Sequence, residues 1–159
     1  MRITYYTIWI LLLTVLQSTV INFTQIYGVK PDLLLIFVVL TAMERGAVTG
    51  TVVGIVVGFI LDGGILGINS LLFMHMGALS GLIFQKVLVS KYYAVIILVI
   101  LSVSFLYEFL FYVMNFTVWG KGNLIYALTR VILPTAAYNT AVCIPFYKIM
   151  RRFSVEREL

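Results

Sequence analysis

Ionisable side chains inside apolar segments are the residues of this chain best placed to do chemistry. Glu108 and Arg130 lie deepest in two predicted apolar helices, over about residues 94–115 and 124–147. We expect these helices to be antiparallel around a loop centred near Trp119, which places both residues 11 positions from that centre. A charge inside a membrane is costly, so pairing is the cheapest arrangement for both side chains. We predict a structural ion pair, with a pair that binds a ligand or a partner as the alternative.

Two further acids, Asp32 and Asp62, lie at the ends of apolar segments, on what we predict to be the outer side of the membrane. Asp32 precedes its segment and Asp62 follows its own. Asp32 is typical of a helix N-cap, and Asp62, followed by two glycines, is typical of a turn. Two carboxylates on one side could also serve acid–base chemistry or hold a cation, but no nearby histidine or third acid supports that. Asn69 closes the glycine-rich stretch that Asp62 opens, and we group it with these acids as a structural or binding residue.

Signatures of catalysis and of metal binding are absent from the sequence. His75 is the only histidine and Cys143 the only cysteine, which excludes a His-pair or cysteine metal cluster. We interpret His75, between two methionines, as a hydrogen-bonded core residue. The chain has no Gly-x-Ser-x-Gly elbow, no phosphate-binding glycine loop and no His-Glu-x-x-His motif. We therefore predict no catalytic residue, no metal and no cofactor.

The elements that position these residues follow from the composition. The chain has 159 residues, of which 62% are apolar and 11% charged, and its mean hydropathy is +1.10. Soluble domains are about 45–50% apolar and about 25% charged, so an ordinary soluble enzyme, a disordered tail and a nucleic-acid-binding module are excluded. Six membrane spans of about 20 residues would use roughly 120 residues. The sequence therefore predicts an all-α integral membrane protein whose residues 1–159 form a single six-span domain.

The apolar runs give the positions of the six predicted spans. We expect them over about residues 3–21, 33–43, 47–61, 70–85, 94–115 and 124–147. The second run is short, because 11 residues rise about 16 Å against a hydrocarbon core of about 30 Å. We therefore expect the hairpin of the second and third spans to be tilted, to thin the bilayer locally or to be partly re-entrant.

Lysine and arginine set the predicted orientation. With the N terminus inside, the inner segments hold eight of these residues, and the outer loops hold only Lys30 and Lys121. This asymmetry obeys the positive-inside rule. We predict that both termini are cytoplasmic.

Glycines recur every four residues in the third predicted span. A step of four residues keeps them on one smooth strip of the helix surface. The strip comprises Gly46, Gly50, Gly54 and Gly58, and a shorter one in the fourth span comprises Gly77 and Gly81. Lipid provides no hydrophobic driving force for helix association, so close packing across small residues stabilises helix pairs instead. We expect the strips to pack the two spans together, with a docking face for another membrane protein as the alternative.

Several short motifs occur in a characteristic order along the chain. They are LQST at 16–19, PDLLL at 31–35, ERG at 44–46, Gly50, Gly54, GFILD at 58–62, LGINSL at 66–71, RVILPT at 130–135, Asn139 and Pro145. In order and spacing they resemble the family of the bacterial rod shape-determining protein MreD. The resemblance covers most of the chain, although residues 86–122 match only as generic hydrophobic sequence.

The resemblance implies a non-enzymatic, multi-pass subunit of the cell-elongation machinery in the bacterial plasma membrane. Such proteins associate with MreC, a single-span membrane protein, and through it with the actin-like MreB and the peptidoglycan synthases of the lateral wall. We expect contact with membrane lipid and none with nucleic acid.

The MreD family is also similar in fold to the substrate-binding subunits, or S-components, of energy-coupling-factor vitamin importers. A subunit of such an importer is therefore the alternative function. It requires a pocket with several convergent polar groups, which the polar residues above could supply (Asp32, Asp62, Asn69, Glu108 and Arg130). Which face of the chain binds MreC is left open by the sequence.

Overall fold

The computed structural model describes residues 2–19, 28–64, 67–87, 93–120 and 123–155. These residues form helices joined by turns and contain no β-sheet, which confirms the all-helical prediction for the described part of the chain. The elements are α1 (Arg2–Thr19), α2 (Leu33–Arg45), α3 (Ala47–Leu61), α4 (Ile68–Val87), α5 (Tyr93–Trp119), α6 (Leu124–Ala127), the π-helical turn η2 (Leu128–Ile132) and α7 (Leu133–Val155). The last three follow one another without a break.

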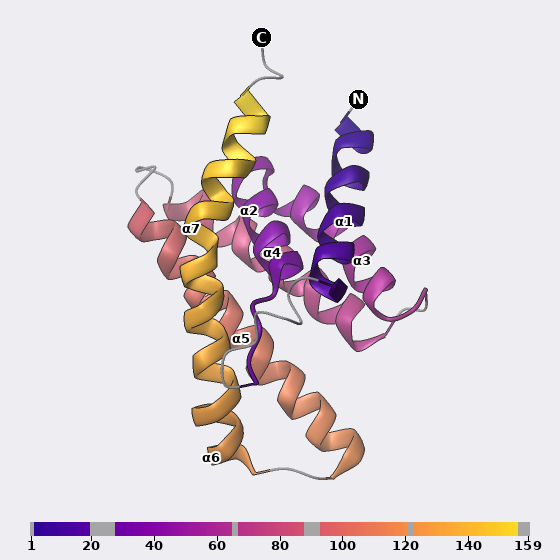
Figure 1. Ribbon diagram of the computed structural model, residues 1–159, viewed down its shortest axis with the longest axis vertical. Helices are drawn as coiled ribbons and strands as arrows, with labels where there is room; N and C mark the ends of the chain where they lie inside the picture. Colours follow the sequence, from indigo (N-terminus) through magenta and orange to yellow (C-terminus); the bar gives the residue numbers. More distant parts are fainter. Residues whose placement is uncertain (1, 20–27, 65–66, 88–92, 121–122, 156–159) are drawn as a thin grey trace.

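Helices α1 to α5 alternate in direction, with α3 and α4 oblique to the long axis, and the continuous α6–α7 helix runs back beside α5 (Figure 1). The described ends of the chain, Arg2 and Val155, lie at one end, which we call the terminal end. At the opposite end, the hairpin end, α5 stops at Trp119 and α6 begins at Leu124. Figure 1 also shows that α5 and the α6–α7 helix extend past α1 to α4 toward the hairpin end.

Helix α2 is the centre of the bundle. Every residue from Leu33 to Met43 is buried, and α1, α3, α4, α5 and α7 all contact the helix. A helix that is apolar on all sides belongs in a core. The second apolar run is thus enclosed by other helices, and its 13 residues rise only about 20 Å.

Helices α3 and α4 pack through the glycine strips. A Cβ atom added at Gly50 would lie 2.8 Å from the carbonyl oxygen of Gly77, and one added at Gly54 would lie 2.7 Å from the carbonyl carbon of Phe73. Similarly close contacts join Gly58 to Ser70 and Gly81 to Ala47. Because the neighbours are backbone atoms, even alanine would force these two antiparallel helices apart.

Gly46 does not belong to the strip in which the sequence placed it. It ends α2 with a φ of 92°, and its N–H donates to the Ala42 carbonyl at 2.9 Å. This left-handed backbone conformation favours glycine. Gly46 therefore makes the turn between α2 and α3, and the strip begins at Gly50.

Two stretches, Tyr93–Thr117 and Leu124–Met150, are long and apolar enough to cross a membrane. Ala47–Leu61 and Ile68–Phe84 are shorter apolar helices. The long stretches lie in α5 and in the continuous α6–α7 helix, so these two elements set the length of the molecule.

The glycine packing gives a first testable prediction. We expect Gly54→Ala to lower the free energy of unfolding by about 1–3 kcal/mol, because the added methyl group meets the α4 backbone. The measurement is denaturant unfolding in detergent micelles. Val52→Ile is the matched control, since it adds one carbon on the same helix at a side chain that is 55% exposed. Equal stability of the two variants would contradict the packing.

Candidate functional site

The N terminus of α2 is closed by hydrogen bonds from side chains. The Asp32 carboxylate accepts from the backbone N–H of Leu35 at 3.0 Å and also from that of Leu34. The Oε1 of Gln17, from α1, accepts from the N–H of Leu33 at 3.1 Å, and its Nε2 donates to the Pro31 carbonyl at 3.2 Å. The first turn of a helix leaves N–H groups without partners inside the helix. Here the side chains of Gln17 and Asp32 accept hydrogen bonds from three of these N–H groups.

Asn139 connects this helix end to two further helices. Its side chain is fully buried in α7, and its Oδ1 accepts from the N–H of Asp32 at 2.7 Å. Its Nδ2 donates to the Oγ of Ser104, on α5, at 3.2 Å. We call the four residues Gln17, Asp32, Ser104 and Asn139 the α2 cap.

A second hydrogen-bond network surrounds Asp62, at the turn from α3 to α4. Its carboxylate accepts from the N–H groups of Gly67, Asn69 and Ser70 at 2.8–3.2 Å. It also accepts from the Asn69 Nδ2 at 2.9 Å and from the Ser70 Oγ at 2.8 Å. We call these residues the Asp62 turn.

The hydrogen bonds determine the charge of Asp62. Burial alone would raise the pKa of its carboxyl, but the hydrogen bonds from Ser70 and Asn69 outweigh burial and hold the pKa below its ordinary value. Asp62 is therefore ionised at neutral pH, and its negative charge is stabilised by the hydrogen-bond donors of the turn.

The two networks meet on α5. Tyr107 donates from its hydroxyl to the Asn69 Oδ1 at 3.1 Å, and its ring packs edge-on against Phe73 with centroids 5.1 Å apart. Ser104 of the α2 cap lies one turn earlier on the same helix. The α2 cap and the Asp62 turn thus form one polar layer, which joins α1, α2, α3, α4, α5 and α7.

The layer is built to position helices. Asp32, Asp62, Asn69 and Asn139 are brought into it, and each bonds to a backbone group or to another member. Within the described residues, no group of three or more His, Cys, Asp or Glu side chains could hold a metal ion. His75 is hydrogen-bonded as expected, with its Nδ1 2.7 Å from the Leu71 carbonyl oxygen, but it is exposed and the core interpretation was wrong.

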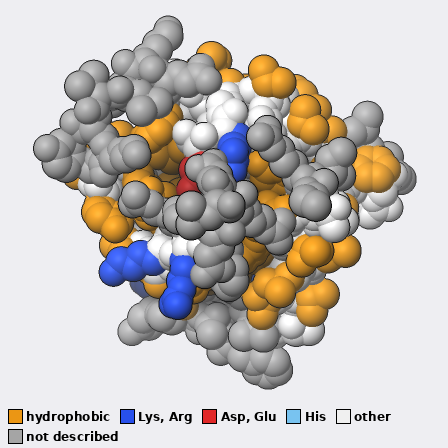
Figure 2. Space-filling view, turned by 90° about the horizontal axis from the view of Figure 1, so that it is seen from above, with side chains coloured by type: hydrophobic (Ala, Val, Ile, Leu, Met, Phe, Trp, Pro, Cys, Tyr) orange, Lys and Arg blue, Asp and Glu red, His pale blue; other side chains and the backbone are white. Residues whose placement is uncertain are grey.

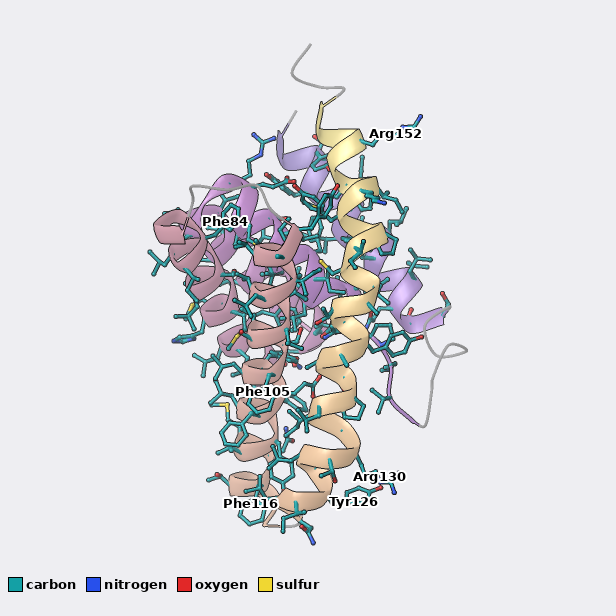
Figure 3. The ribbon with its side chains drawn as sticks, turned by 90° about the vertical axis from the view of Figure 1, so that its left-hand side faces the viewer. Phe84, Phe105, Phe116, Tyr126, Arg130 and Arg152 are labelled. Carbon is teal, nitrogen blue, oxygen red and sulfur yellow. The ribbon has the colours of Figure 1, made fainter. Side chains whose placement is uncertain are left out.

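The predicted pair of Glu108 and Arg130 is wrong. Glu108 is half-buried and Arg130 is exposed, and no ion pair joins them in the part of the chain that the structure describes. Figure 3 shows the Arg130 side chain at the edge of the hairpin, on the side opposite to Phe116.

The error comes from the assumed centre of the loop. Helix α5 continues to Trp119, so Glu108 lies 11 residues from the end of its helix, whereas Arg130 lies six residues after Leu124. The difference is about 7 Å along the axis. Arg130 also lies in η2, a π-helical turn in which the Leu133 N–H donates to the Leu128 carbonyl, five residues earlier.

Sequence reasoning did not single out Gln17, Ser104 or Tyr107 as site residues. Gln17 belongs to the LQST motif, but its role depends on a contact 14 residues along the chain. Ser104 and Tyr107 fall in the segment that matched only as hydrophobic sequence. Their spacing of three residues on an otherwise apolar helix is the signal that could have found them.

The comparison with known families gives one match. The family model described as rod shape-determining protein MreD matches residues 1–156. No curated protein and no solved structure matches the chain.

The α2 cap gives a second prediction. We expect Asn139→Ala to lower the free energy of unfolding by about 1–3 kcal/mol, because the buried N–H of Asp32 loses its partner. Asn115→Ala is the matched control, since Asn115 lies on α5 and bonds only to the Phe111 carbonyl of its own helix among the described residues. The control should change stability by less than about 0.5 kcal/mol. Equal effects in micelle unfolding would mean that the cap does not hold the bundle together.

Proposed function

The chain belongs to the MreD family, whose members determine rod shape, and on that premise we propose that it is a membrane subunit of the bacterial cell-elongation machinery. In this proposal it binds an MreC-like single-span protein and helps to couple MreB to peptidoglycan synthesis at the lateral wall. MreD proteins are membrane proteins that are not known as enzymes, and the polar layer, which uses its groups to hold helices, agrees with a non-enzymatic role.

We further propose that the chain is one domain that crosses the plasma membrane six times, with both termini in the cytoplasm. The alternating helices and the eight-to-two distribution of basic residues support this topology. Seen from the terminal end, Lys and Arg side chains lie on this face with apolar side chains around its rim (Figure 2). Arg152 is one of the basic residues at this end (Figure 3).

The observation that carries the function is the length of α5 and of the α6–α7 helix compared with the other helices. Tyr107 lies level with the α3–α4 turn, and α5 continues for 12 residues beyond it, which is about 18 Å. Both limbs of this hairpin expose large apolar side chains, including Phe116, Ile125 and Leu133 at 45%, 73% and 54%. No described residue covers these side chains, as expected for a subunit that binds another membrane protein.

The importer alternative has less support. Asp32, Asp62 and Asn69, which could have supplied polar groups to such a pocket, accept hydrogen bonds from backbone N–H groups or from Tyr107. A cavity of about 530 Å³ near the hairpin end is lined mainly by apolar and aromatic side chains. This lining offers few of the convergent polar groups that a vitamin-binding pocket requires.

The topology can be tested by cysteine labelling in a Cys143→Ala background, because Cys143 is the only cysteine of the sequence and its removal leaves each introduced cysteine as the only thiol. We expect Thr117→Cys, at the hairpin end, to react with a membrane-impermeant maleimide in intact spheroplasts. Arg152→Cys, at the terminal end, should react only after permeabilisation. The reverse pattern would contradict the orientation, and labelling of both sites from one side would contradict the single span that the α6–α7 helix forms between them.

The partner can be tested by co-purification. We expect the tagged chain, extracted from membranes in mild detergent, to retain the MreC-like protein of the same bacterium in a stoichiometric complex. The energising subunits of a vitamin importer, expressed in the same way, are the control and should not be retained. Recovery of the importer subunits without the MreC-like protein would contradict the proposed function and favour the alternative.

A further inference from the structure

An aromatic stripe with one acid in it runs along the part of α5 that reaches the hairpin end. It comprises Phe105, Glu108, Phe109, Tyr112 and Phe116. Their spacing of 3, 4, 7 and 11 residues from Phe105 places them on one face of the helix. The rings stack in two pairs, Phe105 with Phe109 and Tyr112 with Phe116, with centroids 6.3 and 6.2 Å apart. We call this face the α5 stripe.

Glu108 has no cationic partner among the residues that the structure describes. It is half-buried, and no described residue forms an ion pair or hydrogen bond with its carboxyl. Arg130, the basic residue that the sequence assigned to it, lies nearer the hairpin end and is exposed. An acid in an apolar helix without a partner in its own chain indicates a functional site.

The stripe borders a cavity. The cavity of about 530 Å³ is lined by Phe109, Tyr112, Val113 and Phe116 of α5 and by Asn123 and Leu124 across the hairpin. Within the described residues, the buried hydroxyl of Tyr112, one turn from Glu108, has no hydrogen-bond partner. Phe105 and Phe116, at the two ends of the stripe, are 36% and 45% exposed. The surface thus combines aromatic area with an acid and a hydroxyl, and neither polar group has a hydrogen-bond partner among the described residues.

We propose that the α5 stripe is the docking surface for a transmembrane helix that carries a basic side chain, which pairs with Glu108. This inference rests on the proposed function, in which that helix belongs to the MreC-like partner. Charge complementarity favours a helix over lipid tails, because acyl chains can fill the cavity but cannot neutralise the carboxylate. The flanking rings also suit a basic side chain, since a cation is attracted to the face of an aromatic ring.

Photo-crosslinking locates the surface. Replacing Phe116 with p-benzoyl-phenylalanine should give a crosslink to the membrane helix of the co-expressed MreC-like protein. The same replacement at Leu98, which is 63% exposed at the other end of α5, and at Leu133, which is 54% exposed on the other limb, should give none. Crosslinks from the two control positions alone, or only a phospholipid adduct at Phe116, would overturn the inference.

Charge variants test the pairing itself. We expect Glu108→Gln to lower the co-purified MreC-like protein about tenfold, and Glu108→Lys to lower it further. Glu44→Gln, at the terminal end of α2, is the matched control and should leave the yield unchanged. Exchanging the basic residue of the partner helix for glutamate should restore binding to the Glu108→Lys variant, which shows that the variant is folded.

The outcomes separate this inference from the proposed function. Wild-type yield with both Glu108 variants would overturn the docking surface while leaving the function intact. Absence of the MreC-like protein from the wild-type complex would overturn both.

Discussion

The enclosed N terminus of α2 is the constraint on which the rest of the structure depends. A helix buried on every side cannot give the N–H groups of its first turn to water, and each unsatisfied group in an apolar interior is costly. Here the N–H groups of Asp32, Leu33, Leu34 and Leu35 all have partners, supplied by Asn139, Gln17 and the Asp32 carboxylate. These partners come from α7, from α1 and from the cap residue itself. Closing one helix end therefore fixes the positions of two other helices.

The polar layer divides the molecule into two parts with different surfaces. Toward the terminal end, α2 is surrounded by five helices, and the glycine contacts bring α3 and α4 as close as their backbones allow. Toward the hairpin end, α5 and the α6–α7 helix continue without α2, α3 or α4 beside them. The first part is a closely packed core, and the second presents apolar and aromatic side chains to its surroundings. This division is consistent with the proposed role of a membrane subunit, which requires a stable bundle and a surface for a partner.

Features that depend on local sequence could be predicted. The apolar runs gave the helices to within about four residues, except that α7 continues to Val155, eight residues past the predicted end. The four-residue glycine spacing gave a helix strip, and Asp32 before a leucine run gave an N-cap. Features that depend on contacts between distant segments could not. Nothing near Asn139 in the sequence indicates that it bonds to Asp32, which is 107 residues away. The prediction that Arg130 lies at the same depth as Glu108 was wrong for two reasons. The loop is not centred at Trp119, where α5 ends, and Arg130 lies in a π-helical turn and not in a regular α-helix.

Amide hydrogen–deuterium exchange of the first turn of α2 tests the central claim most directly. In the purified protein in nanodiscs, the account predicts that the amides of Leu33, Leu34 and Leu35 exchange as slowly as those in the middle of the helix, and that Gln17→Leu speeds the exchange of Leu33 most. Fast exchange of all three amides in the unaltered protein, as at a frayed helix end, would contradict the account.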